Sequence, residues 1–563
     1  MGIAAILLFT LFLYWLGRLL VSDACDNDFL RFFLCGTTGL AITMAAFTVL
    51  AALHAFNTTA IIFFGGLAIL LCVRRLGRPS MPDWRFLLIF CCVFASIAVY
   101  AHHPCDGFDA GMYHLPLARA IAESGSLPVL EYIRFPFFPM GGELLFAFGM
   151  MTLGTDFYVN LLATLPLLFV TLGMIGLCLK YTKSLVPGTV AAFALLRLTN
   201  MQFGQAYVDA LLAQFCFAAT VFLQYHLEVP QKRTLLLAGI AAGSALAVKY
   251  VGLPYVGLMY IVFCIFDRKI SQLVRLGCTM LFVGGFWYAR SLLLTGNPFH
   301  PFLGVLFGYS IWTAQDVLYC NYFTAHTGVP KNLTQFFSAF ASIACPYAPA
   351  FLLGVFYKKL RFLFCTCIAF VFLWFFFAQT DRFVVCALPL CFDIASIAIF
   401  SVVRLDTLPR PGKLVLSCLC ALLLLYNAQT LAPMLDHKLS DIPGYALVRE
   451  ANGQGSTMVN LGFESCKYYF DGAMYGDVFG PVRYIDMLTK DDTLNVEYIT
   501  TAMKRHHATL LVVSRHVYLI DEKDGQIYIR KSNIRCNPAE FADRFTLLAE
   551  NNDGYLFALK SSH

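Results

Sequence analysis

The stretch HHPCDGFDAGMYHLPLARAIAESGSLP, from His102 to Pro128, decides how the rest of the chain is interpreted. It holds three His, two Asp, one Glu and one Tyr, yet apolar segments flank it on both sides. The whole chain has 563 residues, of which 59% are hydrophobic and only 13% are charged. Soluble globular proteins carry about 25% charged residues, so this chain must cover most of its surface with lipid. The stretch is therefore a polar loop of a membrane protein.

A helix that crosses a bilayer needs about 20 mostly apolar residues. On that basis the sequence predicts a mainly α-helical, polytopic membrane protein with about 13–14 transmembrane helices. The candidate spans are 3–21, 31–54, 59–73, 86–101, 158–180, 185–199, 206–226, 234–250, 252–266, 276–294, 335–356, 362–378, 383–403 and 413–431. The first has no basic residue before its apolar stretch and no clear small-residue cleavage site. We therefore expect a retained transmembrane helix there rather than a cleaved signal.

The loops between these spans sort by charge, with basic residues at every second boundary. The basic loops hold Arg74, Arg75, Arg78 and Arg85; Lys180 and Lys183; Lys232 and Arg233; Arg268, Lys269 and Arg275; Lys358, Lys359 and Arg361; Arg404, Arg410 and Lys413. Because cytoplasmic loops are enriched in Lys and Arg, we expect these loops to be cytoplasmic. Loops 102–157 and 295–334 and the Gln379–Arg382 turn then face outward, as do the N-terminus and the tail. This layout predicts a multi-pass protein of a bacterial cell (inner) membrane.

Three parts follow from this pattern: N-terminal transmembrane helices in 1–85, a transmembrane core in 86–431 that carries the two long outer loops, and an extracytoplasmic domain in 432–563. The tail is far more polar than the rest. Its segments STMVNLGF, ATLLVVSR and GQIYIRK predict strands, while GYALVREANG and VEYITTAMKRHH predict helices. We therefore expect a small α/β domain outside the membrane.

Asp106, Asp109 and Tyr113 lie close together at the start of the first outer loop. If this segment is helical, Asp109 shares a face with Asp106 and with Tyr113, because residues three and four apart are neighbours on a helix. Gly107 and Gly111 weaken a helix, so a turn between the two acids is the alternative. A carboxylate at the membrane boundary can accept a proton from a hydroxyl. The other interpretation makes Asp109 a solvated loop residue or a helix cap.

Charged residues within or against spans are costly and tend to line cavities or substrate paths. Lys249, Arg290 and Asp209 lie near the outer ends of their spans, and Arg382 lies in an outer turn. Cations on the outer face beside an outer carboxylate suggest an anionic headgroup, and a lipid-linked phosphate is the obvious ligand. The alternatives are snorkelling to the interface or an ion pair such as that of Asp381 with Arg382.

The sequence gives little support for a metal site. His300 and His326 lie in the second outer loop and are candidates for phosphate, acid–base or metal chemistry, but no spacing between ligands supports a metal. Most of the 20 Cys lie inside apolar runs and are interpreted as buried apolar residues. A disulfide between Cys466 and Cys536 in the tail stays open. We predict no certain cofactor, with a divalent metal as the open alternative.

The segments DAGMYHLPLARAIAESGSLP and YIRFPFFP resemble the first outer loop of the GT-C membrane glycosyltransferases. These include the protein O-mannosyltransferases and the lipid A aminoarabinose transferases. Asp109 matches the acidic position of that loop, Tyr113 the later aromatic residue, Gly125 the turn and Pro136 the return to the membrane. WYARSLLLTGNPFHPFLG is similar to the Trp…Arg…Gly-Asn-Pro…Pro stretch of bacterial members. The resemblance implies a GT-C-like fold with an outer C-terminal α/β domain.

The resemblance also implies a transfer reaction with a polyprenyl-phosphate-linked sugar as the donor. Asp109 would act as general base on a hydroxyl of a glycan, lipid or protein acceptor and give an inverted linkage. The donor and its phosphate would be held by residues from the group Arg290, Lys249, Arg382, Tyr113 and His114.

The sequence departs from the family pattern at Ala110, where many relatives have Glu. Asp106 or Glu143 would have to supply any second acid, and Asp106 is the second catalytic candidate. Candidates for the acceptor site or the cavity are Glu143, Asp209, His300 and His326.

Two other function classes share the same ligand and location. A lipid-linked sugar flippase or transporter would use intramembrane cations, but transporters often show repeats or broken helices, and we find no internal repeat. A polysaccharide polymerase or ligase would place critical Arg and His residues in one large outer loop, whereas loop 295–334 has His300 and His326 but no Arg. Membrane lipids are expected partners and nucleic acid is not.

Overall fold

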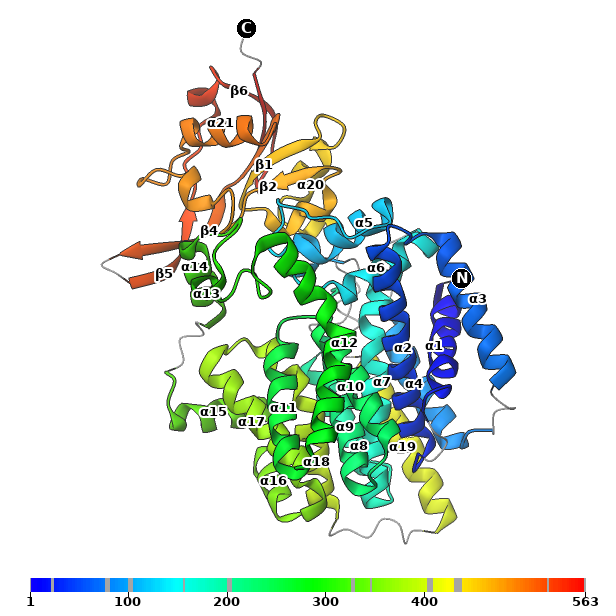
Figure 1. Cartoon of the computed structure of the whole chain (residues 1–563). Coiled ribbons are helices and arrows are strands. Elements are labelled where there is room, and N and C mark those ends of the chain that lie inside the picture. The colour runs from blue at the N-terminus through cyan, green and yellow to red at the C-terminus, as the bar shows by residue number, and fades with distance from the viewer. Residues whose placement is uncertain are drawn as a thin grey trace.

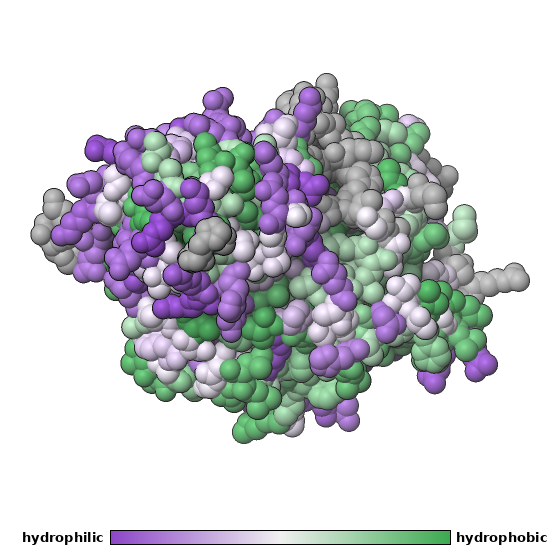
Figure 2. All heavy atoms as spheres, turned by 90° about the horizontal axis from the view of Figure 1, so that it is seen from above, coloured by the Kyte–Doolittle hydropathy of each residue, from purple (hydrophilic) through white to green (hydrophobic). Residues whose placement is uncertain are grey.

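The computed structural model describes residues 2–21, 25–75, 81–99, 105–154, 157–199, 205–325, 330–344, 347–401, 409–429, 438–523 and 526–560. It shows a long bundle of helices that carries a smaller domain at one end (Figure 1). Seen from that end, hydrophilic residues gather over the small domain, and hydrophobic residues cover much of the surface beside it (Figure 2). On this side of the molecule, the polar surface therefore belongs mainly to the small domain.

The bundle contains one helix for each predicted span except 335–356, which is divided between α15 and α16. Its helices are α1 (Gly2–Arg18), α2 (Asp28–Ala52), α3 (Thr58–Arg75), α4 (Trp84–Val99), α5 (Leu115–Ser124), α6 (Gly141–Leu153), α7 (Phe157–Thr182), α8 (Val186–Leu198), α9 (Asp209–Glu228), α10 (Lys232–Leu246), α11 (Gly252–Phe266), α12 (Ile270–Thr295), α15 (Leu333–Ala344), α16 (Ala348–Leu353), α17 (Arg361–Phe377), α18 (Leu388–Phe400) and α19 (Arg410–Gln429). Pro349 fits the first turn of α16 because no N–H is needed there.

Six helical segments within the described part of the chain have at least 18 residues and are apolar enough to cross a membrane. They are α2, α3, α7, α9, α12 and the segment that ends with α17. Shorter apolar helices accompany them, namely α1, α4, α8, α11, α18 and α19. The chain is therefore a multi-pass membrane protein, as its composition predicts.

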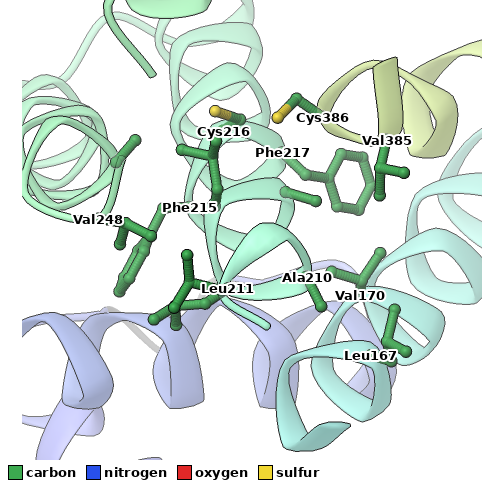
Figure 3. Close-up of a cluster of buried hydrophobic side chains, with 14 of the residues drawn as sticks. Leu167, Val170, Ala210, Leu211, Phe215, Cys216, Phe217, Val248, Val385 and Cys386 are labelled. Atoms are coloured by element: carbon green, nitrogen blue, oxygen red, sulfur yellow. The ribbon is translucent and has the colours of Figure 1, made fainter. Parts of the chain in front are cut away.

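The centre of the bundle is formed by α7 and α9, whose apolar stretches are almost entirely covered by other parts of the protein. Figure 3 shows Phe217 of α9 beside Val385, and Cys216 beside Cys386. Val385 and Cys386 belong to the 3₁₀ segment η6 (Asp381–Cys386), which joins α17 to α18. The packing of η6 on α9 therefore fixes the position of the outer turn that precedes α18.

Basic loops gather at the end of the bundle that lies away from the small domain. Lys180, near the end of α7, has its Nζ 2.8 Å from a carboxylate oxygen of both Asp26 and Glu228. Arg233, at the start of α10, donates to the carbonyl of Leu20 after α1. The start of α1 lies at the opposite end, on the side of the small domain (Figure 1). This arrangement agrees with the prediction that basic loops alternate with outward-facing loops along the chain.

The C-terminal domain is an α/β unit, as predicted. Its five-stranded sheet has the order β2-β1-β3-β7-β6, in which β1 is parallel to β2 and β3, and β7 is antiparallel to β3 and β6. The apolar strand β3 lies at the centre, where both of its faces are covered. Strands β4 and β5 form a separate hairpin. The elements are α20 (Tyr445–Ala451), β1 (Thr457–Leu461), β2 (Ala473–Tyr475), α21 (Val496–Arg505), β3 (Leu510–Ser514), β4 (His516–Lys523), β5 (Gln526–Asn533), β6 (Phe545–Glu550) and β7 (Gly554–Leu559).

The second outer loop helps to build the core of this domain. It forms α13 (Gly304–Phe307) and α14 (Ala314–Ala325). Trp312 packs against Phe479, with ring centroids 4.9 Å apart. Asp316 accepts a hydrogen bond of 3.0 Å from the N–H of Gly480. The packed unit therefore extends beyond the tail and ties it to the bundle through α12.

Candidate active site

Asp109 precedes a turn of π-helix, Ala110–His114, that runs directly into α5. In a π-helix each N–H bonds to the carbonyl five residues earlier, and such turns are frequent at functional sites. The N–H of Leu115 makes this bond to Ala110. The Tyr113 hydroxyl donates to Oδ2 of Asp109 at 3.2 Å. The turn therefore presents its polar side chains beside the carboxylate.

Gly111 allows the turn to meet the C-terminal domain. A Cβ at this position would lie 1.9 Å from the carbonyl oxygen of Ser465. Ser465 belongs to the 3₁₀ segment η10 (Glu464–Tyr469), whose Tyr469 hydroxyl donates to the carbonyl of Cys105 at 2.8 Å. The segment η10 therefore holds the Asp109 turn from the outer side.

Arg382 forms an ion pair with Asp109. Its Nη1 lies 2.6 Å from Asp109 Oδ2, and the side chains are 31% and 8% exposed, respectively. Its guanidinium lies over the rings of Tyr207 and Phe383, 5.5 and 5.7 Å from their centroids. Asp109 caps no N–H of the turn that follows, so it is neither a solvated loop residue nor a helix cap. Among the described residues, the ion pair of Arg382 is with Asp109 and not with its neighbour Asp381.

A second ion pair lies beside the first. Lys249 Nζ donates to Asp209 Oδ1 at 3.0 Å, and both side chains are buried, so Lys249 does not snorkel to the interface. Burial alone would raise the pKa of Asp109. The positive charges of Arg382 and Lys249 outweigh burial and hold this pKa below its ordinary value. Asp109 is therefore ionised at neutral pH.

His114 lies against Glu143 on the buried side of the turn. Its Nδ1 is 2.6 Å from Glu143 Oε1, and both side chains are almost completely buried. In the described structure, His114 Nε2 and Glu143 Oε2 have no hydrogen-bond partner. Both residues line a small internal space together with Tyr113 and Lys249. The expected donor ligand His114 and the expected cavity residue Glu143 thus form one pair behind Asp109.

Two predicted residues lie in other surroundings. Arg290 Nη2 donates to the carbonyl of Leu127 at 3.1 Å and so ties α12 to the loop after α5. Within the described part of the chain, no ion pair joins Arg290 to Asp109. His300 packs edge-on against Phe137, with ring centroids 5.0 Å apart. Burial lowers the pKa of His300 to about 4, so this ring is neutral at physiological pH.

The remaining predicted residues add no metal site. Asp106 is half-buried, three residues before Asp109. His326 lies outside the described residues. Cys466 and Cys536 are both free thiols. Among the residues that the structure describes, no group of three or more His, Cys, Asp or Glu side chains is placed to hold a metal ion.

A cavity of about 850 Å³ opens beside Arg382. Its walls are largely apolar and include Trp374, Phe375 and Val385. Besides Arg382, the polar residues of its wall were not predicted as site residues; they are Gln205, Tyr207, Gln335, Ser338, Ser342, Gln379, Thr380 and Asp381. The available signal was their position at the outer ends of apolar spans. The cavity therefore combines largely apolar walls with the guanidinium of Arg382.

A second and more polar cleft, of about 340 Å³, lies between α5 and the C-terminal domain. It is lined by Pro116, Arg119, Ala120, Glu123, Tyr132, Lys467, Phe470, Asp471 and Gly472. Arg119 is held in place because it stacks on Tyr468 at 4.2 Å and donates to the carbonyl of Phe470 at 3.2 Å. The C-terminal domain covers the polar side of α5. The cleft offers hydrogen-bond donors, acceptors and aromatic rings together.

A buried charge cluster locks the C-terminal domain onto the first outer loop. Arg134 Nε lies 3.2 and 3.3 Å from the two carboxylate oxygens of Asp477, and a terminal nitrogen makes a further contact. Lys467 Nζ donates to Asp477 at 3.3 Å and to the carbonyl of Tyr132 at 2.8 Å. Burial would raise the pKa of Asp477, but Arg134 and Lys467 hold it below its ordinary value. Asp477 therefore helps to hold the domain in place, and its buried side chain is not part of an open surface.

Comparison with known proteins relates the tail to a bacterial family. A family model described as SF2091/S2213 matches residues 435–558. The uncharacterized Shigella flexneri protein SF2093/S2215 is 32% identical over 134 residues, which are 23% of this chain and 67% of that protein. The chain belongs to the family of SF2093/S2215. The uncharacterized Shigella flexneri protein SF2092/S2214 is 26% identical over 141 residues, which are 24% of this chain and 77% of that protein.

Most of the chain has the fold of ArnT from Cupriavidus metallidurans. The ArnT structure bound to undecaprenyl phosphate matches with a TM-score of 0.53 at 13% identity and covers 85% of this chain and 98% of ArnT. The apo structure matches with a TM-score of 0.56 at 12% identity and covers 84% and 97%. The GT-C-like membrane fold with a C-terminal α/β domain is thereby confirmed.

Proposed function

We propose that this protein is a membrane glycosyltransferase that moves a sugar from a polyprenyl-phosphate-linked donor to an acceptor at the extracytoplasmic face. One observation carries this proposal: Arg382 lines the apolar cavity and pairs with the buried carboxylate of Asp109 at 2.6 Å. A cation in the wall of a largely apolar cavity is suited to bind a lipid phosphate, and an ionised carboxylate beside it is suited to act as a general base. The fold shared with an undecaprenyl-phosphate-binding ArnT agrees with this class of ligand.

In the proposed reaction, the polyprenyl chain occupies the cavity of about 850 Å³ and its phosphate meets Arg382. Lys249 adds positive charge nearby, although Asp209 already partly neutralises it. A hydroxyl of the acceptor attacks the anomeric carbon, and its proton passes to Asp109. The bond between that carbon and the phosphate oxygen breaks, and the electron pair leaves with the phosphate. Arg382 stabilises the charge that develops on this leaving group.

The acceptor would approach from the aqueous side, through the polar cleft beneath the C-terminal domain. Arg119 and Lys467 supply donors, while Glu123 and Asp471 supply acceptors. Sugar hydroxyls need both kinds of partner. The floor of the cleft is α5, which continues directly from the Asp109 turn. Attack from the side opposite the phosphate would invert the linkage.

The layout supports a bacterial inner membrane location with the N-terminus and the C-terminal domain outside. The basic end of the bundle around Lys180 would face the cytoplasm. Reporter fusions at the C-terminus that are active only outside the cytoplasm test this orientation.

The transfer reaction is tested with the full chain in proteoliposomes and a panel of undecaprenyl-phosphate-linked sugars, with membrane extract as the source of acceptor. Release of undecaprenyl phosphate is the readout. A general base contributes about 100- to 10,000-fold to rate, so Asp109→Asn should lose activity by this factor. Asp106→Asn tests the second catalytic candidate in the same assay. Full transfer by Asp109→Asn at equal protein level would show that Asp109 is not the base, and lipid movement without transfer would favour a flippase.

A further inference from the structure

Arg382 stands between the cavity and the proposed base. One side of its guanidinium meets Asp109 at 2.6 Å, and the residue also forms part of the cavity wall. The Arg382 side chain is 31% exposed, whereas that of Asp109 is 8% exposed. An anion that occupies the cavity therefore reaches Arg382 before it reaches Asp109.

Among the charged groups around Asp109, Arg382 has the largest effect on its protonation. The titratable and charged groups that face Asp109 are Arg382 of η6, Lys249 after α10, Asp209 of α9, Tyr207 before α9, Tyr113 and His114 of its own turn, and Arg134 of the first outer loop. Lys249 is already paired with Asp209 at 3.0 Å, and Arg134 with Asp477. Across the described residues, Arg382 forms its ion pair with Asp109 alone.

We propose that the phosphate of the donor lipid activates Asp109 by taking over the charge of Arg382. This inference rests on the proposed function and adds a regulation of the same site. Without donor, Asp109 serves as the counterion of Arg382 and is a weak base. With donor, the phosphate shares or replaces that contact, and the affinity of Asp109 for a proton rises. The base is thus switched on only when a lipid phosphate occupies the site.

The proton and charge balance of the reaction fits this switch. The donor is a phosphodiester with one negative charge, and the product is a phosphomonoester with up to two. The acceptor proton resides on Asp109 after transfer, so Arg382 is left with the more highly charged phosphate and a neutral carboxyl. Each change strengthens the contact of Arg382 with phosphate relative to Asp109. Donor therefore binds before the acceptor is deprotonated.

The expected size of the switch follows from the contact itself. An opposite charge within about 4–6 Å lowers the pKa of a carboxyl group by about one to three units. Neutralising Arg382 should return most of that shift. We therefore expect the pH of half-protonation of Asp109 to rise by about one to three units when the donor phosphate binds.

The experiment measures protonation of Asp109 by difference infrared spectroscopy of the full chain in lipid nanodiscs. The signal is the carbonyl stretch of a protonated carboxyl group that is absent from Asp109→Asn. Undecaprenyl phosphate is the probe, and undecaprenol, which has the same chain without the phosphate, is the control. The signal should appear at higher pH with undecaprenyl phosphate and should not move with undecaprenol.

Two variants sharpen the test. In Arg382→Gln the Asp109 signal should already titrate at the higher pH, and undecaprenyl phosphate should move it little. Arg449→Gln removes an arginine charge from an exposed position of α20, outside the cavity, and should behave like the unmodified protein. Native mass spectrometry of the same samples reports lipid binding independently. If the lipid binds and the Asp109 titration does not move, the switch is refuted and the proposed function stands; if the lipid does not bind, both are refuted.

Discussion

Replacing Asp477 by Asn should separate the C-terminal domain from the first outer loop. The change leaves Arg134 and Lys467 buried without their shared counterion, although one acceptor oxygen remains. Breaking a buried ion pair by removing one partner costs about 3–5 kcal/mol. Because Asn retains part of the hydrogen bonding, we expect a loss of about 3 kcal/mol in the free energy of unfolding of the domain.

The assay is urea-dependent proteolysis of the full chain in detergent, with the fraction of intact C-terminal domain as the readout. Asp471→Asn is the matched control, because Asp471 is 63% exposed and lies 3.7 Å from Arg119. Such a surface pair is worth about 0–1 kcal/mol. The triple change Arg134→Met, Lys467→Met and Asp477→Leu should recover most of the stability, since apolar residues of similar volume replace buried charges well.

The pH dependence of this effect has a defined sign. The pKa of Asp477 is depressed in the folded state, because Arg134 and Lys467 overcome the effect of burial. Its stabilisation is therefore complete above the ordinary carboxyl pKa and is lost as the pH falls toward the depressed value. The difference between the unmodified protein and Asp477→Asn should shrink in acid. Equal costs for Asp477→Asn and Asp471→Asn at neutral pH would refute the argument that buried charges hold the domain.

Three further changes test other parts of the structure. Gly111→Ala should cost about 1–3 kcal/mol and reduce transfer, because its Cβ would overlap the C-terminal domain; Gly257→Ala, which has nothing within 4 Å, should be tolerated in the same thermal-shift assay. In the unmodified protein, the free energy of unfolding should fall as the pH drops from the ordinary pKa of His toward about 4. Over this range the His300 ring takes up a proton in the unfolded state but not in the folded state. His300→Phe should remove this pH dependence. Lys249→Met should destabilise the bundle by about 3–5 kcal/mol, and adding Asp209→Leu should restore it, as measured by thermal unfolding in detergent.

The membrane helices could be predicted from the sequence because the bilayer imposes one length and one polarity on every span. The division of 335–356 into α15 and α16 was not visible in hydropathy, which does not register where a helix restarts at Pro349. The strands and helices of the tail were predictable because apolar runs such as those of β1 and β3 are short and bounded by polar turns.

Individual candidate residues could be chosen from the sequence, but their partners could not. Asp109 and Arg382 were each candidates, one from its family position and one from its outer turn, yet hydropathy does not record which charges meet. Arg134 and Asp477 are 343 positions apart, and no local pattern in the sequence joins them. Aromatic residues on both sides of Arg134 were the available signal, since a charge among them is buried only when paired.

The buried pair of Lys249 and Asp209 bears on how the chain is inserted. Lys249 lies at the outer end of α10, on the side where a translocating loop resists positive charge. Asp209 begins the preceding helix, α9, and reaches Lys249 at 3.0 Å. The pair leaves the outer end of the α9–α10 hairpin electrically neutral, which allows a lysine to lie on the side of the membrane that disfavours positive charge.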